Sequence, residues 1–90
     1  MYTRKTVVNN AGGLHARPAA VFAKMASSFE SDVTVRKSEA GAQDQNAKSI
    51  ICLMAMGLDC GAEIEITANG ADERAAVESL VGLVESGCGE

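Results

Sequence analysis

The stretch EIEITANGADERAAVESLVGLV (residues 63–84) changes its hydrophobic period once, and this change indicates the fold class. Apolar residues occupy every second position from 64 to 68, as they do in a strand with one buried face. After a turn-forming Asn-Gly pair, apolar residues recur at helical spacing as far as Val84. Asp72 and Glu73 would lie in the first turn of this helix, where the helix dipole favours anions. The stretch predicts a strand followed directly by an amphipathic helix.

Strand and helix patterns alternate along the rest of the chain. Further strands are predicted at residues 3–8 and 32–37, and a less regular return strand, 43–46, follows a hairpin turn. Helices are predicted from near His15 through residue 29 and within residues 47–56, where the second helix would start near Asn46 or Ser49. The order β-α-β-β-α-β-α predicts an α+β fold in which helices cover one face of an antiparallel or mixed sheet.

Composition narrows the classes of function. Ninety residues without a repeat or linker predict a single domain over residues 1–90. The net charge of −4, with scattered basic residues, argues against binding to nucleic acid or anionic membrane. No apolar run approaches the roughly 18 residues that a membrane span needs, so we expect a cytoplasmic protein without membrane insertion.

The three cysteines show no CxxC spacing, which argues against a disulfide framework and against a zinc site. We expect reduced thiols, with Cys88 exposed in the glycine-rich tail. No metal and no cofactor is expected.

The segment GGLHARPAA (residues 12–20) is where we expect the chemistry. A glycine turn leads the only histidine, His15, to the start of a helix, whose first turn carries unpaired amides and partial positive charge suited to a phosphate. Pro18 fits a first turn because no intrahelical N–H is needed there, although proline disfavours helical geometry at Arg17 and predicts an irregular entry at that residue.

A neutral imidazole is nucleophilic near pH 7, and a guanidinium can donate paired hydrogen bonds to phosphoryl oxygens. His15 and Arg17 are therefore the candidates for accepting a phosphoryl group and assisting its transfer. In the alternative interpretation, His15 only caps the helix and Arg17 is a solvated surface charge.

Two blocks of the chain resemble one family. GLHARPA (13–19) resembles the active-site signature of HPr, the histidine-containing phosphocarrier of the bacterial phosphoenolpyruvate-dependent sugar phosphotransferase system, and NAKSI (46–50) resembles its regulatory serine region. A third similarity, at 69–73, extends the resemblance over essentially the whole chain. The resemblance implies an open-faced β-sandwich, with helices on one face of a four-stranded antiparallel sheet. It also implies phosphorylation of His15 on Nδ1 with help from Arg17.

Segment 36–45 looks a few residues longer than is usual in this family. This difference in length from the family concerns the expected hairpin and does not concern the segment that carries His15.

The run IICLMAM (50–56) holds more apolar residues than one buried helix face needs. It indicates either a docking patch or a helix buried against its neighbours or in a dimer. The resemblance favours docking to enzyme I and to the enzyme II transporter subunits, through Ala20, Lys24, Ile50, Ile51 and Met54.

Ser49 precedes this helix, and its simplest role is a capping hydroxyl. The resemblance adds a regulatory role, in which an HPr serine kinase phosphorylates Ser49 and a catabolite regulator is a further partner. A phosphate there would add almost two negative charges beside the docking patch.

Three functions remain open at this point. The first is a monomeric phosphoryl carrier, and the second is a regulatory protein of the same fold that acts on a transcription regulator or another target. The third is an enzyme with its own small substrate, such as a hydrolase with a phosphohistidine intermediate. The third lacks a second histidine, a metal-ligand cluster and a nucleotide-binding loop in the sequence.

Overall fold

The computed structural model describes residues 1–10 and 12–88. Its elements are, in order, β1 (Tyr2–Val7), α1 (Arg17–Ser27), β2 (Asp32–Lys37), β3 (Gln45–Asn46), α2 (Ile50–Ala55), β4 (Glu63–Asn69) and α3 (Glu73–Glu85). The predicted order of strands and helices is confirmed. Ala11 in the predicted turn and Gly89 in the glycine-rich tail lie outside the described residues.

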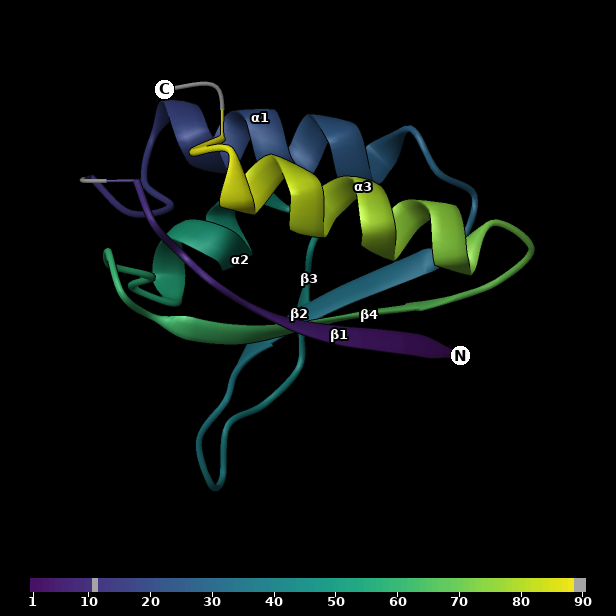
Figure 1. Ribbon diagram of the computed structural model, residues 1–90, viewed down its shortest axis with the longest axis horizontal. Helices are drawn as coiled ribbons and strands as arrows, with labels where there is room; N and C mark the ends of the chain where they lie inside the picture. Colours follow the sequence, from purple (N-terminus) through teal and green to yellow (C-terminus); the bar gives the residue numbers. More distant parts are fainter. Residues whose placement is uncertain (11, 89–90) are drawn as a thin grey trace.

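The strands form one antiparallel sheet in the spatial order β1-β4-β2-β3. β4 is central and pairs with β1 from Tyr2↔Ala68 to Val7↔Glu63, while its other edge pairs with β2. Figure 1 shows the helices together on one side of this sheet. The open-faced sandwich with helices on one face of a four-stranded antiparallel sheet is therefore confirmed.

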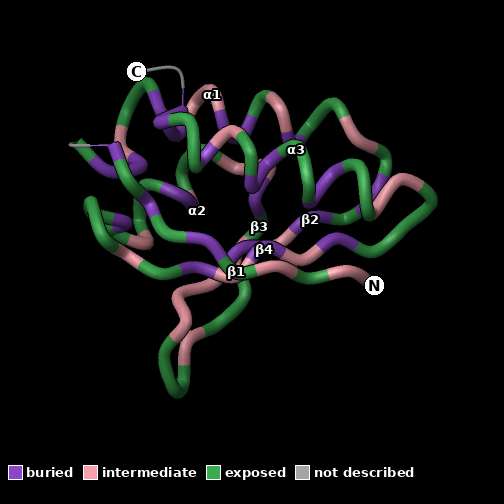
Figure 2. Tube along the Cα trace, viewed as in Figure 1, coloured by how far each residue is buried: buried purple, intermediate pink, exposed green. Residues whose placement is uncertain are grey.

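The core lies between the sheet and the helices. Ile64, Ile66 and Ala68 are fully buried on β4, and their neighbours in the strand are not. Phe22 of α1 and Leu80 of α3 belong to the same buried cluster, and Figure 2 shows the buried parts of the chain between the sheet and the helices. On the open face the hydroxyls of threonines 3 and 67 lie 2.8 Å apart. The period-two pattern of the strands thus places apolar side chains on the face that the helices cover and polar side chains on the face exposed to solvent.

Two predicted elements are shorter than expected. The return strand covers only Gln45–Asn46, and the connection from β2 to β3 projects from the sheet on the side away from the helices (Figure 1). The helix expected within 47–56 covers Ile50–Ala55 and takes the later of its two predicted starts, because the carbonyl of Asn46 accepts a turn bond from the amide of Ser49 at 3.1 Å and Ser49 is the N-cap. Across residues 1–10 and 12–88, none of the helices combines the length and apolar character needed to cross a membrane.

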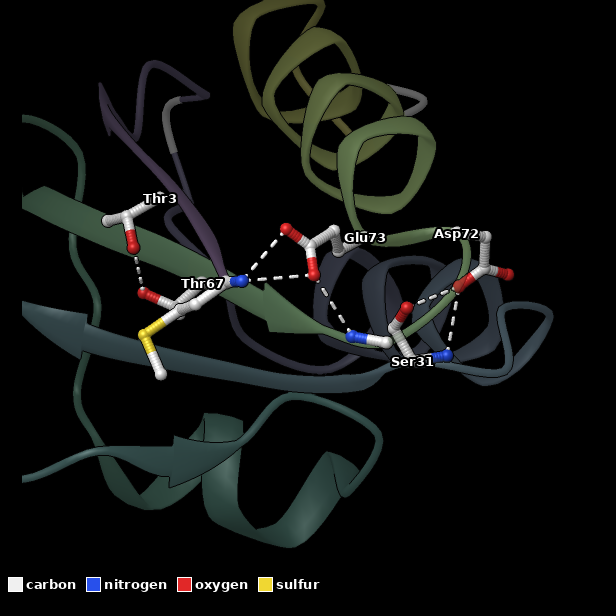
Figure 3. Close-up of polar contacts among 7 residues, drawn as sticks. Thr3, Ser31, Thr67, Asp72 and Glu73 are labelled. Atoms are coloured by element: carbon white, nitrogen blue, oxygen red, sulfur yellow. Dashed lines mark hydrogen bonds and ion pairs between the residues drawn. The ribbon is translucent and has the colours of Figure 1, made fainter.

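Asp72 joins the start of α3 to the loop that follows α1. The sequence predicts Asp72 in the first helical turn, but it is the N-cap residue, and its carboxylate faces another segment. It accepts a hydrogen bond from the amide of Glu30 at 2.9 Å. It also accepts from the amide of Ser31 at 2.9 Å and from the hydroxyl of Ser31 (Figure 3). The Ser31 hydroxyl, followed by the two amides, lowers the pKa of Asp72 below its ordinary value.

The Asp72 contacts predict an acid-sensitive contribution to stability. Because the pKa is lower in the folded state, the contribution is complete above the ordinary value of 3.8 and is lost as the pH falls through the folded-state pKa. We expect Asp72→Asn to lower the thermal midpoint at pH 7 by about 4–8 °C, and this difference to shrink toward pH 2.5. Thermal unfolding followed by circular dichroism measures both. A difference that stayed constant from pH 7 to pH 2.5 would contradict this assignment, and Asp32→Asn controls for the loss of one exposed charge.

Candidate functional site

The segment before α1 is held in a tight turn. The side-chain amide of Asn10 donates to the carbonyl of Gly13 at 2.6 Å, and the Gly13 amide donates back to the carbonyl of Asn10 at 3.0 Å. Gly13 has φ +69°, a left-handed conformation that glycine adopts without cost. The next side chain, Leu14, is fully buried. This turn anchors the chain one residue before His15.

A second loop, which connects α2 to β4, packs against this turn. The amide of Leu14 donates to the carbonyl of Leu58 at 2.7 Å, and the amide of Gly61 donates to the carbonyl of Val8 at 2.6 Å. Gly13 lies so close to this loop that a Cβ at position 13 would be 2.2 Å from the Leu58 carbonyl oxygen. Residues 57–62 and the segment before α1 therefore form one packed unit.

His15 lies two residues before the start of α1, close to the predicted start of this helix. α1 begins at Arg17, and the N-cap residue Ala16 has φ 48° and ψ −113°, an unusual conformation for a residue with a side chain. The irregular backbone expected at Arg17 is found at Ala16 instead. Arg17, which immediately precedes Pro18, is already the first residue of the helix. The first helical bond runs from the amide of Ala20 to the carbonyl of Ala16 at 3.0 Å.

The N-terminus of α1 offers donors to an anion. Within the described part of the chain, no side chain caps this helix. By helix geometry the amides of Arg17 and Ala19 have no intrahelical acceptor, and Pro18 has no amide hydrogen. Arg17 is exposed, and the side chain of His15 is 41% exposed. The imidazole of His15, the guanidinium of Arg17 and the amides without an intrahelical acceptor therefore all lie at the N-terminal end of α1.

The structure adds one residue that sequence reasoning missed. Nε2 of His15 lies 3.2 Å from Oδ1 of Asp59, whose side chain is 85% exposed. Asp59 is 44 positions away in a turn between α2 and β4, and its local sequence carries no signal of a partner. Only the packing of the two loops brings them together.

The other predicted site residues lie on α1 and α2, which pack against each other. Ser49 caps α2, and its hydroxyl accepts a hydrogen bond from the amide of Cys52 at 3.3 Å. Leu53 is buried, whereas three large apolar side chains of this helix are exposed, so α2 is not sealed between the sheet and its neighbours. The candidate docking residues comprise exposed Lys24, half-buried Ala20 and the exposed Ile50, Ile51 and Met54.

One expectation about the cysteines is wrong. Cys88 is buried, because the chain turns back after α3 through left-handed conformations at Gly87 and Cys88, and the Cys88 amide donates to the carbonyl of Leu83 at 2.9 Å. Cys52 is half-buried and Cys60 is exposed.

Comparison with known proteins agrees with this geometry. A family model described as the PTS HPr component phosphorylation site matches residues 2–86. The phosphocarrier protein HPr of Haemophilus influenzae is 40% identical over 84 residues, which cover 93% of this chain and 95% of that protein. The HPr-like protein Crh of Bacillus subtilis is 40% identical over 85 residues, which cover 94% of this chain and 96% of that protein.

Solved structures give the same answer. The crystal structure of HPr-C-His from Thermoanaerobacter tengcongensis superimposes with a TM-score of 0.92 at 41% sequence identity, and the match covers 100% of this chain and 98% of that one. Sequence and fold together show that this chain belongs to the HPr family of phosphocarrier proteins of the phosphotransferase system.

Proposed function

We propose that this chain accepts a phosphoryl group on Nδ1 of His15 from phospho-enzyme I and passes it to the enzyme II transporter subunits. The observation that carries the proposal is the half-exposed imidazole of His15 at the uncapped N-terminus of α1, with Arg17 next in the helix. The first-turn amides and the guanidinium can hold three phosphoryl oxygens, while the open side of the ring remains accessible to a donor or an acceptor.

A carrier must bind two kinds of partner in turn and release both. The exposed apolar side chains of α2, with Ala20 and Lys24 of α1, form a compact surface suited to transient complexes. Methionine at position 54 can adapt its shape to different partners. We further propose that residues 1–90 form one domain that acts as a cytoplasmic monomer.

A phosphoryl-transfer assay tests the carrier function. The chain is incubated with labelled phosphoenolpyruvate and enzyme I, and a single acid-labile adduct is expected. Adding a transporter subunit should then remove the label from the chain. An adduct that no enzyme II subunit can accept would favour the regulatory alternative, and turnover of a small substrate by the chain alone would favour an enzyme.

We also propose that phosphorylation of Ser49 by a serine kinase controls access to the docking surface. Ser49 directly precedes the exposed side chains of Ile50 and Ile51. A phosphate on Ser49 would therefore place negative charge beside the apolar side chains that we expect each partner to contact. We expect Ser49→Asp to lower kcat/KM for phosphorylation by enzyme I by about 3- to 10-fold, the effect of about 1 kcal/mol of lost binding. Steady-state kinetics with enzyme I gives this value.

Ser49→Asn is the matched control for the charge. Asparagine caps a helix about as well as serine or aspartate, so both variants should unfold at nearly the parent temperature. Equal rates for Ser49→Asp and Ser49→Asn would rule out control by charge at this position.

A further inference from the structure

The Asp59 carboxylate is held beside His15 by its backbone, although its side chain is exposed. Its neighbour Leu58 is fully buried, and the Leu58 carbonyl accepts the amide of Leu14, the residue before His15. The Asp59 carbonyl itself accepts the amide of Ala62 at 3.0 Å. Gly13 closes the gap, since even a methyl group there would meet the backbone of Leu58 and Asp59. The two loops thus fix the backbone of Asp59 beside the segment that carries His15, within reach of the ring.

The contact distinguishes the two ring nitrogens of His15. Oδ1 of Asp59 lies 3.2 Å from Nε2, and an ionised carboxylate can only accept a hydrogen bond. The contact is therefore favourable when Nε2 carries the proton. In a neutral imidazole a proton on Nε2 leaves the electron pair on Nδ1.

We propose that Asp59 is a positioning residue for phosphoryl transfer at His15: its carboxylate accepts the Nε2 proton and so keeps Nδ1 as the nucleophile. This inference rests on the proposed function and adds the residue that selects the reacting nitrogen. Asp59 touches neither the phosphoryl group nor the donor, and it acts through the ring.

The same contact serves both directions of transfer. When the Nδ1 electron pair attacks phosphorus, the bond from phosphorus to the donor atom breaks and its electrons remain on the donor. His15 then carries the phosphoryl group on Nδ1 and the original proton on Nε2, and the ring bears a positive charge. The Asp59 carboxylate stabilises that charge. In the reverse step the electrons of the N–P bond return to Nδ1 and leave the neutral Nε2–H ring.

The size of the effect follows from the exposure of the pair. At 85% side-chain exposure for Asp59, the contact is a solvated charge-assisted hydrogen bond of modest strength. We expect Asp59→Ala to lower the ratio of Nε2–H to Nδ1–H tautomers about two- to five-fold, and kcat/KM with enzyme I by a similar factor. Asp59→Asn keeps an acceptor oxygen and should restore most of the tautomer ratio.

Nitrogen-15 NMR of the ring at about pH 8.5, where an ordinary imidazole is neutral, measures the tautomers without any partner protein. Glu39→Ala is the matched control: Glu39 lines the same shallow hollow as Asp59, and in the described structure it has no ion pair with His15. Its tautomer ratio and its rate should equal those of the parent. Circular dichroism checks the fold of each variant, and Asp59→Ser, whose hydroxyl is too short to reach Nε2, replaces Asp59→Ala if the latter unfolds.

An unchanged tautomer ratio in the alanine or serine variant would overturn the proposal, and so would a changed ratio with an unchanged rate. Failure of the parent chain to take a phosphoryl group from enzyme I would instead overturn the proposed function. The tautomer ratio would then still decide whether Asp59 controls the ring. The two failures are therefore distinguishable.

Discussion

His15→Ala is expected to abolish phosphorylation by enzyme I, with a loss in rate of more than about 1,000-fold. The substitution removes the only imidazole in the chain, and neither the amides of α1 nor Arg17 can form a covalent bond to phosphorus under these conditions. The His15 side chain is 41% exposed and contacts the carboxylate of Asp59, which is itself exposed, so the free energy of unfolding should change by less than about 0.5 kcal/mol. Acid-labile label and thermal unfolding together measure the two effects.

Arg17→Ala is the matched comparison. It keeps the nucleophile and removes one group that stabilises phosphoryl charge, so the adduct should still form at a rate lower by about 10- to 100-fold. An acid-labile adduct on His15→Ala would place the acceptor elsewhere in the chain. Equal losses in the two variants would mean that the segment acts as a structural unit instead of a nucleophile and its helper.

Periodicity in the sequence predicts the layers of this fold well. β2 occupies the predicted residues and β4 ends one residue later than predicted, because period-two alternation reports directly which face of a strand is buried. For the start of α2 the sequence leaves two alternatives, Asn46 and Ser49, because IICLMAM is apolar at every position and has no period that could choose between them. There the boundary depends on the hydroxyl of Ser49, which caps the helix after the chain has made a turn at Asn46.

The candidate site is only partly predictable for a related reason. A local segment brings His15 and Arg17 to one helix end, so the residues themselves indicate the chemistry. Asp59 reaches His15 through the packing of two loops, and no periodic pattern encodes a contact between irregular segments 44 residues apart. The reversal of the chain at Cys88 was missed for the same reason, since a non-glycine residue with positive φ is not signalled by the sequence.

Gly13→Ala should be the most destabilising change of a single methyl group in the site region, at about 2–5 kcal/mol. Two independent costs combine at this position. The backbone has φ +69°, which disfavours a side chain, and the new Cβ would lie 2.2 Å from the carbonyl oxygen of Leu58 and 2.9 Å from Cα of Asp59. Backbone atoms cannot rotate away as a flexible side chain could, so the loop that carries Asp59 must move.

Two other glycines separate these costs. Gly41→Ala has φ +81° with open space around its Cβ, and it should show the conformational cost alone, about 1–2 kcal/mol. Gly12→Ala also has open space and no left-handed backbone, and it should be close to neutral. Denaturant unfolding of the three variants gives the free energies of unfolding. If Gly13→Ala were no worse than Gly41→Ala, the two loops would not be in the tight contact described.

The functional consequence of Gly13→Ala follows from the same contact. Displacing Leu58 lengthens the hydrogen bond from the amide of Leu14 and moves Asp59 away from Nε2 of His15. The ring then loses both its carboxylate partner and the backbone bond that holds the preceding residue. At a temperature where the variant is still folded, kcat/KM with enzyme I should fall at least as far as it does for Asp59→Ala, and the His15 tautomer ratio should fall with it. Full activity in a folded Gly13→Ala variant would show that transfer does not depend on the packing of the two loops.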